Sequence, residues 1–271
     1  MISPNCPITD DEWSLLMSPD TVSNPFESET INALLNRRSV RKYADAPVSD
    51  AHVDAILSAA LRAPTSSNVQ AYSVIQVRDQ AIKERIAVPC GNQKHIVSCP
   101  VFLAFLADLT RIEAAFQRHD HSADDNNLEL GLVATIDAAL VGMAAYVAAE
   151  SLGIQGVMIG AVRNDPEEIA AILELPKRVY AVFGMCLGFP DEAPKQKPRM
   201  PQTGIVHRDR YDAGASLAVI DPYNADLKAH YDAIGKSTTP DSWSDEIDAK
   251  LSAKARDGLR AALKARGFDF T

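Results

Sequence analysis

The sequence predicts an α+β fold in which helices cover a sheet, and three of its features favour that fold. Short apolar runs bounded by polar residues or proline, which are typical of strands, recur along the chain. Segments with helical signals lie before and between these runs. The composition of the 271 residues, 46% hydrophobic and 23% charged, is that of a soluble globular protein. We expect one domain over 28–271, with a C-terminal extension, after an irregular arm over 1–27 that contains four prolines.

The chain should enter this fold through two helices. The first is expected to run from about Ser28 to Asn36. The second should begin after Pro47, with Ser49 as its N-cap, and end near Pro64. The apolar face of the second helix consists of Val53, Ile56, Leu57 and Ala60.

Four segments are predicted to be strands because they are apolar and end in polar residues, glycine or proline. They are AYSVIQV at 71–77, VFLAFLA at 101–107, GVMIGAV at 156–162 and VYAVFGMCLGFP at 179–190. A helix should follow the third strand, with Asn164 or Asp165 as its cap and Pro166 in its first turn.

The longest apolar run, residues 131 to 154, predicts a buried helix. Its length approaches that of a membrane span, but Asp137 and Glu150 interrupt it and alanine is abundant in it. We therefore expect no membrane insertion. Small side chains allow the helix to pack closely against several others, including helices of a second subunit, so we expect an oligomer.

Beyond Pro190 the regular patterns become weaker. Four prolines within 190–202 predict an extended loop. A final helix is expected over about 244–266, where apolar residues repeat every four positions. These residues are Ile247, Leu251, Ala255, Leu259 and Leu263.

The charge of the chain limits its partners and its compartment. A formal net charge of −9 argues against nucleic acid, because phosphate backbones attract basic surfaces. No Lys or Arg occurs before Arg37, so the charged start of a secretory signal is missing and we expect a cytoplasmic protein. The four cysteines are scattered without a C-x-x-C pair, which indicates buried or incidental thiols.

A basic cluster stands out in this acidic chain, at Arg37, Arg38, Arg41 and Lys42. Guanidinium groups and the Ser39 hydroxyl can bind a phosphate, although a solvated helix end would have the same composition. Other loops offer polar, cationic or backbone groups to a ligand. These loops are PTSSNVQ (64–70), GNQKH (91–95) and KPR (197–199), and MIGA (158–161), at the end of a predicted strand, offers backbone N–H groups.

No other motif indicates catalysis. IGKSTT at 234–239 lacks the first glycine of a phosphate-binding loop. HDHSADD at 119–125 lacks the further ligands of a catalytic zinc site, so a solvated loop and no metal are expected there. The chain contains neither G-x-S-x-G nor G-x-G-x-x-G, which argues against an esterase elbow and a Rossmann site.

Seven segments occur in the order and spacing of the oxygen-insensitive nitroreductases: RRSVRKY, TSSNVQAYSVIQV, GNQKHI, ESLGIQGVMIGAVRNDPEEIAAILELP, VFGMCLGFP, KPRMP and DSWSDEI. Over about 28–267 the chain resembles the NADPH nitroreductase and flavin reductase branch of that FMN-dependent superfamily. The resemblance implies a three-layer sandwich, with a central, mostly antiparallel sheet flanked by helices. It also implies an interlocked homodimer with one FMN in each of two interface sites.

The resemblance further implies roles for individual residues. Arg37, Arg38, Ser39, Val40 and Arg41 would line the FMN phosphate, with Arg41 as its main counter-charge. Contacts with substrate or NAD(P)H are expected from Ser66, Lys236 and Arg256. The other implied FMN-binding residues are Thr65, Gln93, Lys94, His95, Met158, Ile159, Gly160, Ala161, Lys197, Pro198 and Arg199.

The implied activity is the transfer of two electrons from NADPH or NADH to nitroaromatics, quinones or flavins by a ping-pong mechanism. The flavin N5 would carry the hydride, so no catalytic side chain is expected, and the protein would supply placement. Two other classes stay open. One is a flavin-binding sensor without turnover, and the other is a redox enzyme such as a dehalogenase or an enoate or azo reductase.

Some positions depart from the family pattern. Relatives carry arginines before the W-S-D motif, where they could bind the 2′-phosphate of NADPH. At those positions this chain has Ile234, Thr239 and Pro240 instead. Lys236 is the only cation close to them, so NADH use or dual use is plausible. Arg37 occupies a position where histidine is familiar, and Ala161 one where glycine is familiar.

Overall fold

The computed structural model of the protein describes residues 28–122, 127–236, 240–252 and 256–270. The expected arm over 1–27 lies outside these residues. The chain divides into two compact units. Unit 1 comprises the chain up to Pro194 together with the segment from Gly258 onward, and unit 2 is Lys195–Asp257.

The sheet of unit 1 is antiparallel throughout, with the strand order β1-β2-β4-β3. All eight residues of β2 are buried, which explains why this strand is an unbroken apolar run rather than an alternating one. The strands are β1 (Tyr72–Val77), β2 (Val101–Asp108), β3 (Gln155–Ile159) and β4 (Val179–Gly188).

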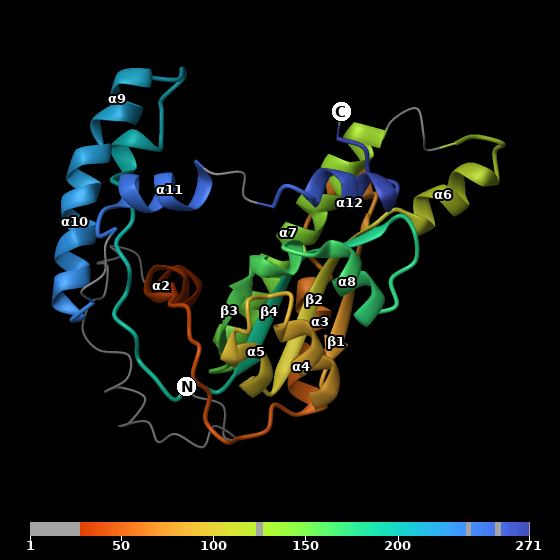
Figure 1. Ribbon diagram of the computed structural model, residues 1–271, viewed down its shortest axis with the longest axis horizontal. Coiled ribbons are helices and arrows are strands. Elements are labelled where there is room, and N and C mark those ends of the chain that lie inside the picture. Colours follow the sequence, from red (N-terminus) through yellow and green to blue (C-terminus); the bar gives the residue numbers. More distant parts are fainter. Residues whose placement is uncertain (1–27, 123–126, 237–239, 253–255, 271) are drawn as a thin grey trace. The chain divides into compact units, whose positions relative to one another are not determined.

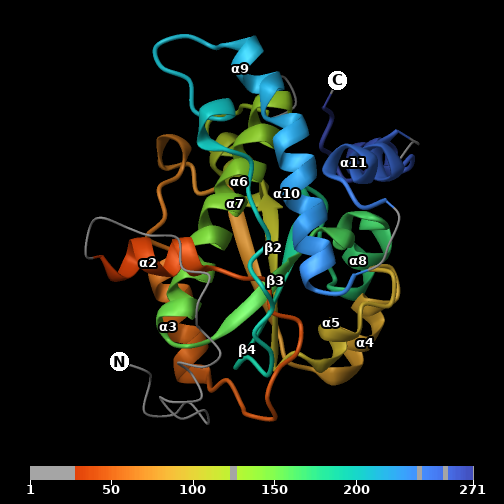
Figure 2. The same cartoon turned by 90° about the vertical axis from the view of Figure 1, so that its left-hand side faces the viewer.

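Helices cover both faces of this sheet. Alternate residues of β2 point to opposite faces, as in any strand. Leu103 and Phe105 belong to the core that contains α3 and α7, while Phe102 and Leu106 belong to the core of α4, α5 and α8. Figure 2 shows these two groups of helices on opposite sides of the strands. The expected three-layer α+β sandwich is therefore confirmed. The helices of unit 1 are α2 (Glu29–Asn36), α3 (Asp50–Ala60), α4 (Gln80–Ala87), α5 (Lys94–Ser98), α6 (Thr110–Gln117), α7 (Asn127–Ser151), α8 (Pro166–Ile172) and α12 (Leu259–Ala265), with the 3₁₀ turns η1 (Ser66–Asn68) and η3 (Gly160–Arg163).

The predicted helix starts agree with the structure. Ser28 caps α2 by accepting the Ile31 N–H at 3.3 Å. Ser49 caps α3, whose buried residues are Val53, Ile56 and Ala60. The cap of α8 is Asp165, one of the two residues expected, and Pro166 begins that helix.

The long helix α7 runs along the sheet (Figure 1). Among the described residues, it is the one helix that is long enough and apolar enough to cross a membrane. Its buried face, however, forms part of the core. Gly142 allows close contact, since a Cβ atom there would lie 2.3 Å from the Phe183 ring. The helix that the apolar run predicts is therefore a central packing element of unit 1.

Two elements differ from the prediction: one strand is shorter, and one helix is divided into two. The third strand ends at Ile159, and Gly160–Arg163 form the turn η3 instead. The single helix expected over 244–266 is wrong: α11 (Trp243–Leu251) lies in unit 2, whereas α12 lies in unit 1. Arg256 has a left-handed backbone (φ 60°), which a continuous helix excludes. The four-residue repeat therefore does not form one apolar face, and Leu251 is 63% exposed while Leu263 is 7% exposed.

Unit 2 contains helices that the sequence patterns did not reveal. Tyr223, Leu227 and Tyr231 form the buried side of one of them at a spacing of four residues. The elements of this unit are η4 (Gln202–Gly204), α9 (Ala213–Ala218), α10 (Ile220–Ala233) and α11.

The cysteines of unit 1 agree with the prediction of buried thiols. Cys90, Cys99 and Cys186 are buried and free. Cys6 lies outside the described residues. In the histidine-containing segment at 119–125, His119 and His121 are exposed, and residues 123–125 lie outside the described residues.

Candidate active site

The basic loop 37–41 follows α2 directly and lies beside β3. The helix ends at Asn36, and the backbone then becomes extended. The N–H of Val40, a fully buried residue, donates to the Gly156 carbonyl at 3.0 Å. This bond fixes the middle of the loop against the sheet. The loop residues that are exposed or partly exposed are Arg37, Ser39 and Arg41.

Tyr146 of α7 supports this loop from behind. Its hydroxyl donates to the Arg38 carbonyl at 2.6 Å and lies 3.0 Å from the Gly156 carbonyl. Arg37 donates to the same hydroxyl at 3.4 Å, and its guanidinium carbon lies 5.4 Å from the centre of the Tyr146 ring. Tyr146 therefore links the basic loop, β3 and α7, a role that the sequence did not reveal.

Glu192 joins the basic loop to the chain after β4. Its Oε1 accepts the N–H groups of Arg41 at 2.6 Å and Lys42 at 3.2 Å. His95 lies within the same electrostatic environment, because burial and the positive charge of Arg41 lower its pKa while Glu192 opposes that shift. His95 of the GNQKH segment thus responds to the charges of both Arg41 and Glu192.

The loop that carries Thr65 and Ser66 is held by a buried carboxylate. Asp137 of α7 is fully buried, and its two oxygens accept the N–H groups of Ser66 and Ala71, each at 3.0 Å. Three residues of this loop have left-handed backbone angles, which are unfavourable for side chains other than glycine. They are Ser67 (φ 46°), Asn68 (φ 58°) and Gln70 (φ 54°).

The segment Met158–Ala161 lies where β3 passes into η3. Met158 is 37% exposed, whereas Ile159 is buried. A Cβ atom at Gly160 would lie 3.4 Å from the Arg163 guanidinium group, which is an ordinary van der Waals distance.

In unit 2, Lys197 and Lys236 meet at Tyr231. The Lys197 amino group donates to the Tyr231 hydroxyl at 2.7 Å, and the Lys236 amino group lies 3.8 Å from the centre of its ring. Tyr231 in turn donates to Glu246. Burial acts to raise the pKa of Glu246, but hydrogen bonds from Lys250 and Tyr231 and the charge of Lys197 outweigh it and hold the pKa at about 2. An ionised Glu246 thus balances the lysines.

The remaining predicted residues of unit 2 have simpler surroundings. Arg199 donates to the carbonyls of Lys197 and Pro198, at 3.0 and 3.1 Å. Pro198 also accepts the Tyr223 hydroxyl at 3.1 Å. Arg256 is exposed and follows α11.

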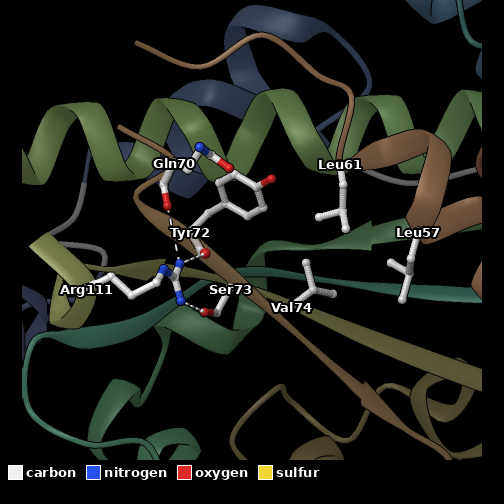
Figure 3. Close-up of a pocket in the computed structure, with 7 residues that line it drawn as sticks. All are labelled: Leu57, Leu61, Gln70, Tyr72, Ser73, Val74 and Arg111. Carbon is white, nitrogen blue, oxygen red and sulfur yellow. Dashed lines mark hydrogen bonds between the residues drawn. The ribbon is translucent and has the colours of Figure 1, made fainter. Parts of the chain in front are cut away.

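A pocket of about 350 Å³ lies elsewhere in unit 1, between α3 and β1 (Figure 3). Figure 3 shows Arg111 at one end of it and Leu57 and Leu61 at the other. Arg111 pairs with Asp108 at 3.2 Å and donates to the carbonyls of nearby residues, so its charge is already balanced. None of the expected FMN-binding residues lines this pocket in the part of the chain that the structure describes.

The basic loop itself has the properties of an anion site. Arg38 Nε and His95 Nε2 are buried and have no hydrogen-bond partner within the described ranges. Buried groups of this kind are normally satisfied, so a polar ligand would compensate them. Guanidinium groups near backbone N–H groups and apolar side chains suit a flat molecule that carries a phosphate, such as FMN.

The fold and this site together define a class: a three-layer α+β protein with an arginine-rich loop beside a sheet edge. The model of the Nitroreductase family matches residues 34–189, and that of the Nitroreductase family, C-terminal domain, matches residues 197–271. The chain belongs to the nitroreductase family. The expected family is thereby confirmed.

Individual relatives are similar over nearly their whole length. The oxygen-insensitive NADPH nitroreductase of Salmonella typhimurium is 36% identical over 244 residues, which are 89% of this chain and 98% of the relative. A hypothetical oxidoreductase, YcnD from Bacillus subtilis, is 35% identical with a TM-score of 0.85, over 89% and 98% of the two chains. The NADPH:FMN oxidoreductase from Vibrio harveyi complexed with NAD⁺ is 32% identical with a TM-score of 0.76, over the same shares.

Proposed function

We propose that the protein is an FMN-dependent oxidoreductase that takes two electrons from NAD(P)H and passes them to a nitroaromatic, a quinone or a flavin. The observation that carries the proposal is the anchored basic loop, in which the buried Nε of Arg38 has no hydrogen-bond partner among the described residues. The names of the relatives agree, since one is an NADPH nitroreductase and another an NADPH:FMN oxidoreductase.

The residues would divide the binding of FMN between its two ends. Arg37, Arg38, Ser39 and Arg41 would hold the phosphate, because guanidinium and hydroxyl groups donate to its oxygens. The backbone of 158–161 would lie against the flavin ring, with Gln93, Lys94 and His95 on a neighbouring loop. When bound, FMN would supply the hydride-accepting N5 atom. The protein places the reacting partners in contact and holds the ring in one orientation.

Unit 2 would supply cations to the flavin and to its electron donor. Lys197 and Arg199 would contribute to FMN binding, and Lys236 to NAD(P)H binding. Glu246 balances these lysines and holds them near Tyr231. Ser66 and Arg256 would contact substrate or NAD(P)H. The departure at residues 234–240 leaves NADH and NADPH as alternative donors.

We also infer a homodimer, which we expect in the cytoplasm. α7 exposes a row of large apolar side chains at intervals of about four residues, which places them on one face. A second copy of the chain would bury this face. Tyr146 supports the basic loop, and Asp137 supports the loop that carries Thr65 and Ser66. The two residues are nine positions apart, roughly 13 Å along α7, so these two loops lie apart within one chain. The exposed apolar residues are Leu128, Leu132, Ile136, Leu140 and Met143.

Steady-state oxidation of NADH and of NADPH with a quinone acceptor tests the proposed activity. The expected result is turnover that depends on FMN, and the ratio of the two kcat/KM values would identify the donor. A yellow protein that oxidises neither donor would contradict the enzyme and favour the sensor.

Replacement of Arg41 tests the phosphate site. Arg41→Ala should weaken FMN retention by roughly 1.5–3 kcal/mol, the scale of a hydrogen bond to a charged group. The measurement is the dissociation constant of FMN from fluorescence of the released flavin. Arg85→Ala, which removes an exposed arginine from α4, is the matched control and should leave retention unchanged. Equal retention in both variants would argue against the role of Arg41.

A further inference from the structure

The chain after β4 runs beside the end of the basic loop and pairs with it. The Ala44 N–H donates to the Phe189 carbonyl at 2.9 Å, and the Asp191 N–H donates to the Lys42 carbonyl at 3.0 Å. An antiparallel bridge lies between these two hydrogen bonds. The two segments, both of which belong to unit 1, therefore form a short antiparallel pair.

Glu192 extends this pairing through its side chain. Its Oε1 atom accepts the Arg41 N–H at 2.6 Å and the Lys42 N–H at 3.2 Å. One carboxylate oxygen thereby satisfies two consecutive backbone donors of residues that are otherwise exposed. Hydrogen bonds to an ionised acceptor are stronger than those between neutral groups, so this contact fixes the backbone of the basic loop at Arg41.

The contact engages the backbone of Arg41 and leaves its side chain to other partners. A carboxylate beside an arginine commonly pairs with the guanidinium group. In the part of the chain that the structure describes, however, no ion pair joins Arg41 to a carboxylate. Its Nη1 atom donates instead to the Ser39 carbonyl of the same loop, at 3.4 Å. A guanidinium group has several N–H donors, so the others are available to an anion.

The place of the Arg41 guanidinium group depends on the backbone from which its side chain projects. Without Glu192, the N–H groups of Arg41 and Lys42 would lose their acceptor, and this end of the loop would be less well ordered. A binding group that is already in place costs less conformational entropy on association than one that must be ordered by the ligand. An ordered loop therefore favours the binding of an anion by Arg41.

We propose that Glu192 is a positioning residue of the FMN phosphate site, whose carboxylate holds the backbone at Arg41 and Lys42 so that the Arg41 guanidinium group is in place before FMN binds. The proposal rests on the proposed function, in which Arg41 binds that phosphate. The negative charge of Glu192 by itself disfavours a phosphate nearby. Its benefit to FMN binding comes from the two hydrogen bonds to the loop.

Two flavins separate this positioning role from a general structural role. FMN and riboflavin have the same ring and the same ribityl chain, and they differ only in the phosphate group. A residue that positions the phosphate site affects the binding of FMN alone, whereas a residue that only stabilises the fold affects both flavins alike. The measurement is the dissociation constant of each flavin from the flavin-free, full-length protein, obtained from the change in flavin fluorescence on binding.

Glu192→Ala removes both hydrogen bonds to the loop. It should raise the FMN dissociation constant about tenfold, the effect of one lost hydrogen bond to a charged group, and change that of riboflavin by less than about twofold. Glu192→Gln keeps a side-chain oxygen that can accept the two N–H groups, so its FMN dissociation constant should lie within about threefold of the wild-type value. Asp191→Ala removes an exposed carboxylate from the neighbouring position and should leave both constants unchanged.

Three results would overturn the positioning role and leave the proposed function intact. They are equal losses of FMN and riboflavin affinity in Glu192→Ala, wild-type FMN affinity in Glu192→Ala, and FMN binding by Glu192→Gln that is as weak as that of Glu192→Ala. Glu192→Met, which has a similar length and no oxygen acceptor, should behave as Glu192→Ala and replaces it if circular dichroism shows that the alanine variant does not fold. A wild-type protein that binds neither flavin would overturn the proposed function, and this inference with it.

Discussion

Asp137 lies in the middle of an apolar helix, where its two carboxylate oxygens accept backbone N–H groups from Ser66 and Ala71. The loop between these residues contains left-handed backbone conformations that cost free energy. Two charge-assisted hydrogen bonds offset part of this cost and hold the loop in one geometry. The acidic residue that interrupts the apolar run therefore has a structural role at a candidate binding loop.

Replacing Asp137 by asparagine should destabilise unit 1. The amide NH₂ group would face a backbone N–H, so one buried donor would lose its acceptor, at a cost of roughly 2–3 kcal/mol. Urea unfolding of Asp137→Asn and of the exposed control Glu129→Gln measures this difference. If both variants unfold at the wild-type urea concentration, the hydrogen bonds of Asp137 do not stabilise the loop.

At the scale of the element, α7 combines two kinds of surface. One face packs so closely on the sheet that Gly142 leaves no room for a Cβ atom beside Phe183. Another face exposes large apolar residues. Helical propensity alone would favour alanine over glycine by about 1 kcal/mol, so the glycine is explained by packing and not by helix formation.

Gly142→Ala should consequently destabilise the protein although alanine is the better helix former. The added methyl group would lie 2.3 Å from the Phe183 ring and force it to move, with a net cost of about 1–2 kcal/mol. Chemical unfolding measures the change. Gly258→Ala is the control and should be close to neutral, because among the described residues no atom other than those of its chain neighbours lies within 4 Å of the new Cβ. A stabilised Gly142→Ala variant would contradict the close packing.

Other elements show where local patterns suffice and where they fail. Strand β2 and helix α3 occur where their apolar patterns predict them, since burial of a local pattern decides both. The repeat over 244–266 instead belongs to two helices in different units. Spacing alone could not reveal this, because the left-handed backbone at Arg256 and the return of the chain to unit 1 depend on distant packing.

At the scale of the whole molecule, the exposed apolar face of α7 is the feature that indicates a partner subunit. A row of five large side chains, from Leu128 to Met143, is between 38% and 54% exposed. Single exposed apolar residues are common on protein surfaces, but a continuous row on one helix is typical of an interface. The proposed dimer would bury this row.

Ile136→Glu should therefore convert the dimer to monomers, because a charge would be buried at the centre of the row. Light scattering after size-exclusion chromatography measures the mass. Val88→Glu changes an exposed apolar residue at the C-cap of α4 and should leave the mass of a dimer. A dimeric Ile136→Glu variant would place the subunit interface elsewhere.

Several properties of this protein follow from the sequence alone. The strand positions, the Ser49 cap of α3, the start of α8 near Pro166 and the family depend on local or ordered signals, which a linear pattern can carry. The basic cluster at Arg37–Arg41 indicated an anion site for the same reason. The roles that the family resemblance implies for individual residues remain predictions.

Only the tertiary structure decided what surrounds the basic loop. Tyr146 and Glu192 are more than a hundred residues from Arg37 along the chain, yet both form hydrogen bonds with the loop. No spacing rule connects such residues, since their proximity results from the packing of α7 and of the chain after β4 against the sheet edge.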